Sequence, residues 1–208
     1  MSPQLRKITT YKDVYSAIAP ETYSRSDFEG KVVIVTGSGN GIGKATGLAF
    51  SQLGASVVFT DLSVKTAQSA ADEATQKFGN RAIAVGGDVT KLADMKTLVA
   101  ETNDRFGSID VVVFSAGYGM FDRFDLSRSE DWWGLVETNL KGPVDLTRLV
   151  LPDMLKQNKG TLIYVASRVS PLRALINLRL GSETVLIQQL TMCQKRDSFD
   201  SLEVFKRI

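Results

Sequence analysis

Short apolar runs alternate with longer stretches of helical spacing along this chain, and this alternation limits its fold more than any other feature. The runs are rich in Val and Ile and cover residues 32–36, 56–60, 81–85, 110–114 and 161–166. Uninterrupted apolar runs of this length are typical of strands buried on both faces of a parallel sheet. Helical spacing is found over residues 64–78, 92–106 and 129–156. In the last of these stretches, the residues expected to face inward are Leu135, Val136, Leu140, Val144 and Leu151.

Strands that alternate with helices form right-handed βαβ units. We therefore predict the α/β fold class, with a Rossmann-type doubly wound parallel sheet in three layers, α/β/α. The length of 208 residues fits one domain. Residues 1–30 lack a clear period and are predicted to be an N-terminal extension, and residues 31–208 to be a single domain.

The composition excludes several kinds of site. The chain has no His and a single cysteine, Cys193, so we predict no Ser-His-Asp triad, no metal site and no intrachain disulfide. Lys and Arg number 25 against 23 Asp and Glu, and a net charge of +2 provides no broad basic surface for nucleic acid. No apolar run reaches the roughly 18 residues of a membrane span. A cytoplasmic protein that binds neither nucleic acid nor membranes is expected.

A glycine-rich segment connects the first predicted strand directly to a helix. Its candidate binding residues are Gly37, Ser38, Asn40, Gly41, Ile42 and Gly43. Glycines let the backbone turn sharply and approach a pyrophosphate, and the helix N-terminus adds free N–H groups and a positive dipole end. Between a strand and a helix, this segment predicts a dinucleotide-binding turn.

Asp61 stands at the end of the second predicted strand. A carboxylate in this place accepts hydrogen bonds from the ribose hydroxyls of an adenosine. The same carboxylate repels a 2′-phosphate, and neither Asn40 nor Leu62 provides a cation to compensate. The sequence therefore favours NAD(H) over NADP(H).

The spacing Thr-Gly-x-x-x-Gly-x-Gly at residues 36–43 resembles that of the short-chain dehydrogenase/reductase family. Four further segments agree with the family in the same order. They are Asp88-Val89 after the third run, Ser115-Ala116-Gly117 after the fourth, Asn139 in the long helical stretch, and Ser167 after the fifth run. The resemblance covers residues 28–190, and the segment Tyr-Lys-Asp-Val-Tyr at 11–15 is similar to fungal members.

This resemblance implies an oxidoreductase that transfers a hydride between a nicotinamide and a hydroxyl or carbonyl carbon of a small-molecule substrate. It implies cofactor contacts for the glycine turn and Asp61, and also for Asp88, Val89, Ser115, Ala116 and Gly117. Asn139 and Ser167 correspond to catalytic residues of the family. The resemblance further implies a homodimer through the helices around Asn139 and after Thr184.

The family's general acid is a Tyr that lies thirteen residues beyond the catalytic Ser, and a Lys four residues later lowers its pKa. Leu180 and Thr184 occupy these positions here, and no Tyr of the chain has a Lys four residues on. Leu exchanges no proton, and Thr supplies no cation to activate a phenol. The resemblance also implies a helix over 185–190 and a short last strand over 202–208. The chain is expected to lack the family's substrate lid and final strand, which leaves the sheet shortened at its C-terminal edge. We expect an NAD(H)-binding oxidoreductase by descent, with impaired turnover.

Three alternatives stay open, and one of them is a damaged or mis-spliced gene whose last exons are not translated as they were in its ancestor. A catalytically inactive, nucleotide-binding pseudoenzyme with a regulatory or interaction role would keep the cofactor residues and lack the acid–base pair. A methyltransferase also places a glycine loop before a helix, although it does not explain five family segments in order. Glu183 could replace the missing acid, but the first turn of a helix capped by Ser182 is the favoured interpretation.

Overall fold

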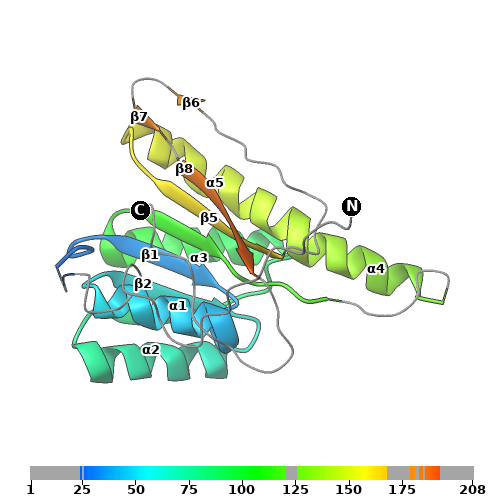
Figure 1. Ribbon diagram of the computed structural model, residues 1–208, viewed down its shortest axis with the longest axis horizontal. Coiled ribbons are helices and arrows are strands. Elements are labelled where there is room, and N and C mark those ends of the chain that lie inside the picture. The colour runs from blue at the N-terminus through cyan, green and yellow to red at the C-terminus, as the bar shows by residue number, and fades with distance from the viewer. Residues whose placement is uncertain are drawn as a thin grey trace, which may run out of the picture.

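The computed structural model describes residues 24, 26–119, 126–167, 179–180, 183–184 and 186–192. Six strands form one sheet in the order β3-β2-β1-β4-β5-β8, and every neighbouring pair is parallel (Figure 1). They are β1 (Val32–Thr36), β2 (Ser56–Asp61), β3 (Ala82–Gly86), β4 (Val111–Phe114), β5 (Thr161–Ser167) and β8 (Leu186–Met192). The helices are α1 (Gly41–Gln52), α2 (Val64–Phe78), α3 (Leu92–Phe106), α4 (Ser129–Val136) and α5 (Gly142–Lys156), and the π-helical turn η3 (Glu137–Lys141) joins the last two.

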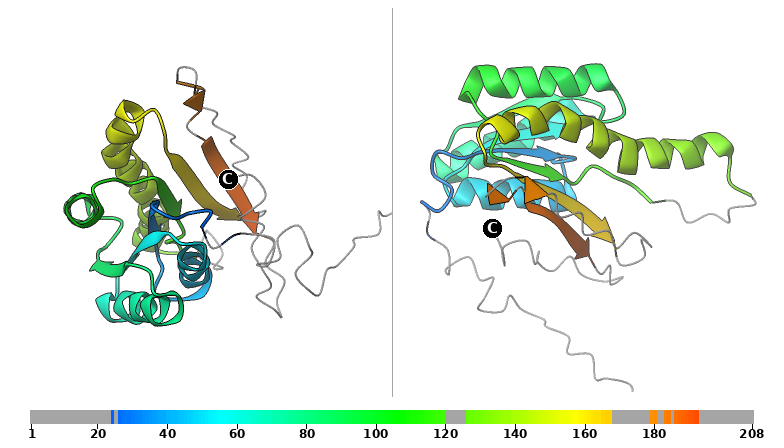
Figure 2. Two further views of the ribbon diagram at one scale, coloured as in Figure 1. Left: turned by 90° about the vertical axis from the view of Figure 1, so that its left-hand side faces the viewer. Right: turned by 90° about the horizontal axis from the view of Figure 1, so that it is seen from above.

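Helices cover both faces of the sheet, which explains why its central strands carry apolar side chains on both faces (Figure 2). On one face, α1 and α2 bury Phe50 and four alanines against Val33, Val35 and Phe59. On the other face, α3 and α5 pack against alternate residues of the same strands. These contacts involve Ile34, Val58, Val112, Met95, Leu98, Leu146, Val150 and Met154. The predicted three-layer, doubly wound architecture is confirmed, and the first five predicted strands agree with the observed ones to within one residue at either end.

The predicted inward face of the long helical stretch is wrong. Leu140 and Val144 are 56% and 45% exposed, whereas α5 buries Gly142, Leu146, Val150 and Met154 against the sheet. The helix carries two apolar stripes, and periodicity alone does not decide which of them faces the sheet. The π-helical turn before α5 also shifts the phase of the residues that follow it.

The predicted helix over 185–190 is also wrong, because Leu186–Met192 forms β8 beside β5. Short apolar runs are ambiguous between helix and strand, and the edge of β5 offers unpaired backbone groups that a strand can satisfy. A small antiparallel pair, β6 (Arg179–Leu180) with β7 (Glu183–Thr184), precedes β8. The strand predicted over 202–208 lies outside the described residues.

Most of the predicted extension over residues 1–30 also lies outside the described residues. Its last part joins the fold: the Phe28 ring packs edge-on against Phe50, with ring centroids 5.1 Å apart, and the Phe28 N–H donates to the Leu53 carbonyl. None of the described helices is long and apolar enough to cross a membrane.

An ion-pair cluster joins α1 to α2 on the outside of the molecule. Lys44 of α1 and Lys77 of α2 lie 2.7 and 2.5 Å from the Glu73 carboxylate. Hydrogen bonds from Lys44 and then Lys77 lower the pKa of Glu73 to about 2. The cluster therefore holds the helix that follows the glycine turn against its neighbour.

Replacing Glu73 tests this link. We expect Glu73→Gln to lower the free energy of unfolding at pH 7 by up to about 1 kcal/mol, since the pair is partly exposed and screened. Because the folded-state pKa is depressed, the contribution is present above the ordinary pKa of 4.5 and is lost as the pH falls toward 2. Urea unfolding at pH 7 and at lower pH measures the difference between variant and wild type. Asp72→Asn, an equal change of charge on the same helix, is the control, and a pH-independent difference for Glu73→Gln would contradict the prediction.

Candidate functional site

The turns that follow β1 to β4 lie along the carboxyl edge of the sheet (Figure 1). The strand order reverses between β1 and β4, so that β2 and β3 lie on one side and β5 on the other. In open α/β sheets, a crevice forms at such a switch point and receives ligands. The predicted site residues on these turns are thus brought to one edge.

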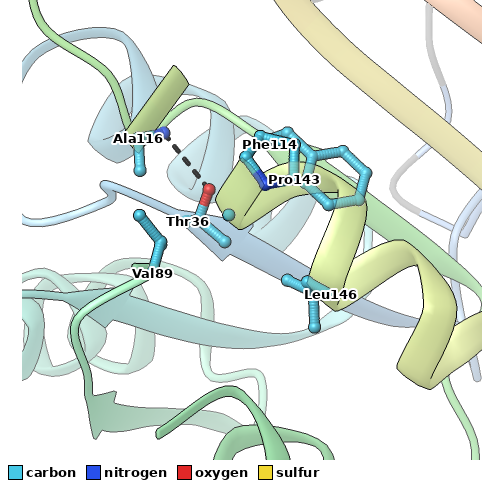
Figure 3. Close-up of a pocket in the computed structure, with 7 residues that line it drawn as sticks. Thr36, Val89, Phe114, Ala116, Pro143 and Leu146 are labelled. Carbon is cyan, nitrogen blue, oxygen red and sulfur yellow. Dashed lines mark hydrogen bonds between the residues drawn. The ribbon is translucent and has the colours of Figure 1, made fainter. Parts of the chain in front are cut away.

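Thr36 joins the turns after β1 and β4. Its hydroxyl oxygen accepts hydrogen bonds from the backbone N–H groups of Ser115 and Ala116, at 3.1 and 3.2 Å. The two turns approach so closely that a Cβ at Gly37 would lie 2.6 Å from the Ala116 Cα. Figure 3 shows Thr36 and Ala116 in a narrow apolar pocket with Val89 and Pro143. Ser115, Ala116 and Gly37 are therefore held together at the switch point.

The glycines of the turn serve different purposes. Gly37 and Gly41 have φ values of 63° and 54°, which glycine adopts without strain. A Cβ at Gly43 would lie 2.2 Å from the Gly37 carbonyl oxygen, whereas one at Gly41 would meet no described atom within 4 Å. Gly37 and Gly43 thus permit close packing, and Gly41 faces open space.

The N-terminus of α1 is open beside Gly41. Asn40 precedes the helix, is exposed, and makes no side-chain capping hydrogen bond to the described residues. The first N–H groups of a helix, here those of Gly41, Ile42 and Gly43, have no partner within the helix itself. A positive dipole end with unused donors suits a phosphate.

Ser38 is placed differently from the other residues of the turn. It is fully buried, and both its N–H and its hydroxyl donate to the Thr60 carbonyl, at 3.0 and 3.3 Å. Its donors are thus occupied inside the protein. Ser38 shapes the turn, and the direct cofactor contact predicted for it is not available through these two groups.

The Asp61 carboxylate lies under the glycine turn. Its Oδ2 accepts the Gly39 N–H at 3.0 Å, and its Oδ1 accepts the Ser63 N–H at 3.1 Å. The Thr66 hydroxyl is 3.4 Å from Oδ1. All three donors are uncharged, and none of the described lysines or arginines forms an ion pair with Asp61. The carboxylate is held in place with its charge uncompensated.

Asp88 and Val89 form the turn after β3. Hydrogen bonds from the Thr90 hydroxyl and N–H, with the nearby Lys91 ammonium, lower the pKa of Asp88. Asp88 is therefore ionised at neutral pH. The Val89 carbonyl packs on the start of α5, where a Cβ at Gly142 would lie 2.8 Å from it.

Asn139 lies in η3, the π-helical turn between α4 and α5. Its Oδ1 accepts the Tyr118 N–H at 3.1 Å, and its Nδ2 donates to the Tyr118 carbonyl at 2.8 Å. A Cβ at the adjacent Gly117 would lie 2.9 Å from Oδ1. Inserted π turns are frequent at functional sites, and this one presents Asn139 to the turn after β4.

Ser167 ends β5, at the carboxyl edge where the predicted site lies. Leu180 and Thr184 do not lie at this edge. The β5–β8 register pairs Thr161 with Leu186 and Ser167 with Met192, so Thr184 comes just before the amino end of β8. Six strand residues, about 20 Å, separate the two ends. The expectation that Leu180 and Thr184 occupy the acid and base positions beside Ser167 is corrected: they belong to the β6–β7 pair instead.

Tyr164 is the tyrosine of β5, and its position does not suit it as a substitute acid. Its ring stacks on Phe114 with centroids 4.4 Å apart, and its hydroxyl lies 2.6 Å from the Thr147 hydroxyl of α5. Burial raises the pKa of Tyr164 above its usual value, whereas a catalytic phenol needs a lowered one.

Sequence reasoning missed three supporting residues. Thr36 enters the sequence analysis only through the glycine spacing, but its hydroxyl joins two turns. Gly142 makes the close contact with Val89, and the Thr66 hydroxyl contacts Asp61. A glycine inside a helical stretch is a signal for close packing and could have indicated Gly142. Thr66 has no such signal, because a threonine in the first turn of a helix is ordinary. Within the described part of the chain, no group of three metal-binding side chains is found.

The family follows from comparison with known proteins. The family model for short chain dehydrogenases matches residues 31–176, more than half of the chain. This chain belongs to the short chain dehydrogenase family. The fold and the order of the site segments agree with the family resemblance of the sequence.

Individual relatives match the same part of the chain. It is 36% identical to a 3-oxoacyl-[acyl-carrier-protein] reductase of Thermotoga maritima, over 68% of this chain and 57% of the relative. It is 34% identical to a short chain dehydrogenase of the fungus Pseudocercospora fijiensis, over 76% and 51%, and 38% identical to mouse L-fucose dehydrogenase, over 68% and 50%. The chain thus spans little more than half the length of these relatives.

Solved structures superpose on the same fold. The L-sorbose reductase of Gluconobacter frateurii, in complex with NADPH and L-sorbose, superposes with a TM-score of 0.67 at 31% identity, covering 72% of this chain and 57% of that one. A hydroxysteroid dehydrogenase of Escherichia coli superposes with a TM-score of 0.63 at 31% identity, covering 68% and 60%.

Removing the Asn139 amide tests how this site is held together. We expect Asn139→Ala to release the Tyr118 backbone, so that the Tyr118 N–H exchanges with solvent deuterium roughly 10-fold faster, the equivalent of one hydrogen bond of about 1.4 kcal/mol. The Ser115 N–H, bonded to Thr36 instead, is the internal control and should be unchanged. Equal exchange of Tyr118 in both proteins would show that Asn139 does not support this turn.

Proposed function

We propose that this chain is an NAD(H)-binding oxidoreductase of the short chain dehydrogenase family, whose turnover is impaired because its acid–base pair is missing. The observation that carries the proposal is the arrangement of Asp61 beneath the glycine turn, next to the open N-terminus of α1. An anionic, uncompensated carboxylate suits two ribose hydroxyls and disfavours a 2′-phosphate. The L-sorbose reductase is in complex with NADPH, so the preference proposed for NAD(H) depends on this chain's own residues.

Each part of the proposed cofactor would have residues of this chain to hold it. Asp61, Asp88 and Val89 would hold the adenosine, and the amides of Gly41, Ile42 and Gly43 beside Asn40 would hold the pyrophosphate. Gly37, Ser115, Ala116 and Gly117 would line the continuation toward Asn139. The nicotinamide of bound NAD(H) supplies or accepts a hydride at a hydroxyl or carbonyl carbon. Ser167 would orient the substrate oxygen at this end of the crevice, and Asn139 would hold a water of the proton relay.

A second candidate is a nucleotide-binding pseudoenzyme with an interaction role. It is favoured by the position of Leu180 and Thr184 in the β6–β7 pair, away from the carboxyl edge. Loss of general acid–base catalysis costs about 10²- to 10⁴-fold in rate. The two candidates share the cofactor site and differ only in whether any turnover remains.

We also propose a homodimer and a reducing, cytoplasmic location, the latter from the single cysteine. The outer surface from α4 to α5 exposes Trp133, Leu140 and Val144, by 57, 56 and 45%. None of the eight residues of α4 is buried, and α4 extends past the end of the sheet (Figure 1). An exposed apolar surface of this kind suits a protein interface. The second predicted interface helix is a strand, so the proposed interface uses α4, η3 and α5.

Cofactor titration tests the proposed function. We expect NADH to accept excitation energy from Trp132 and Trp133 on binding, and NADPH to bind at least 10-fold more weakly. Asp61→Ala should weaken NADH binding roughly 10- to 100-fold, since a hydrogen bond to a charged group is lost, and should not weaken NADPH binding. Asp72→Ala is the matched control. Equal affinity for NADH and NADPH would contradict the NAD preference, and absence of binding would contradict the cofactor site.

Rates with a panel of small ketones separate the two candidates. Slow but measurable NADH oxidation supports the impaired oxidoreductase, and binding without turnover supports the pseudoenzyme. Because Leu180 and Thr184 do not flank Ser167, the double change Leu180→Tyr and Thr184→Lys should not raise the rate.

The dimer is tested by mass in solution. Light scattering should give twice the chain mass for the wild type and the single mass for Leu140→Glu/Val144→Glu, because charges cannot be desolvated at an apolar interface. Gln76→Glu on the exposed face of α2 is the control. A monomeric wild type would rule out this interface.

A further inference from the structure

Asp61 receives hydrogen bonds from three neutral groups, of which only one is a side chain. The Gly39 and Ser63 N–H groups are backbone donors, at 3.0 and 3.1 Å. The third donor is the Thr66 hydroxyl of α2, 3.4 Å from Asp61 Oδ1. A carboxylate accepts about four hydrogen bonds, so these three orient it and leave capacity for a ligand.

The Thr66 hydroxyl has one proton and two acceptors within reach. It lies 2.9 Å from the Ser63 carbonyl and 3.4 Å from Asp61 Oδ1. When a ribose hydroxyl donates to Oδ1, the Thr66 proton can point to the Ser63 carbonyl instead. Thr66 therefore orients the Asp61 carboxylate in the protein without ligand. When a ligand binds Oδ1, the Thr66 hydroxyl keeps a hydrogen bond by donating to the Ser63 carbonyl.

Thr66 also restricts the residue opposite it in the glycine turn. A Cβ at Gly39 would lie 2.3 Å from the Thr66 hydroxyl oxygen and 2.9 Å from the Asp61 Cγ. Only glycine fits between the turn and α2 without displacement of these groups. A Lys or Arg, which would attract a 2′-phosphate, is thereby excluded from position 39.

We propose that Thr66 is a positioning residue for cofactor selectivity: by orienting the Asp61 carboxylate against Gly39, it strengthens the preference for NADH over NADPH. The inference rests on the proposed cofactor function and deepens it. A carboxylate held in one orientation accepts hydrogen bonds from both ribose hydroxyls and repels a 2′-phosphate. A carboxylate that rotates freely does both less effectively.

The test is the ratio of the two dissociation constants, Kd(NADPH)/Kd(NADH), in Thr66→Val and Thr66→Ser. Valine keeps the shape and removes the hydroxyl, and serine keeps the hydroxyl. We expect the ratio to fall roughly 3- to 10-fold in Thr66→Val, the range of one neutral hydrogen bond, and to be retained in Thr66→Ser. A purely structural role at the start of α2 would weaken both cofactors equally and leave the ratio unchanged.

The outcomes are separable. If the wild type binds NADH and Thr66→Val keeps the wild-type ratio, the role of Thr66 is overturned while the cofactor site stands. If the wild type binds neither cofactor, the proposed function fails first and the inference with it.

Discussion

The hydroxyl of Thr36 holds the two turns at the centre of the sheet against each other, and the candidate site depends on that contact. By accepting the Ser115 and Ala116 amides, it fixes the turn after β4 beside the one after β1. Gly37 then meets Ala116 with no room for a side chain. Since these turns flank the point where the strand order reverses, the contact sets the shape of the crevice in which a cofactor would bind.

The other turns are attached to this centre by equally short contacts. Gly39 and Asp61 connect the glycine turn to β2, Gly142 and Val89 connect α5 to the turn after β3, and Asn139 is bonded to Tyr118 after β4. Each contact brings a backbone group against a glycine, a carboxylate or an amide, which keeps the spacing short and specific. The buried apolar side chains on both faces of the sheet provide the rigid support that such spacing requires.

The family's chemistry needs residues that bind the cofactor and residues that transfer a proton, and this chain matches the first group better than the second. The residues predicted to hold adenosine and pyrophosphate lie at the carboxyl edge of the sheet. Leu180 and Thr184, which the sequence spacing assigned to the acid and base positions, lie instead in the β6–β7 pair that precedes β8. Tyr164 does not replace the acid, since burial raises the pKa of its phenol. The residues predicted for cofactor binding and those predicted for proton transfer thus lie on different elements of this chain.

The sequence by itself determined the βαβ order, five of the strands, the glycine turn and Asp61, because buried parallel strands and phosphate turns leave local patterns of apolar runs and glycines. Tertiary structure decided what local patterns leave undetermined. Two apolar stripes on the helix around Asn139 competed for the sheet, and contact with α3 and β4 selected Leu146 over Val144. The family resemblance predicted a helix over 185–190, and the free edge of β5 made this segment a strand. Thr66 contacts Asp61 across a turn, and Gly142 contacts Val89 from a distant part of the sequence. Only the folded chain sets these two distances.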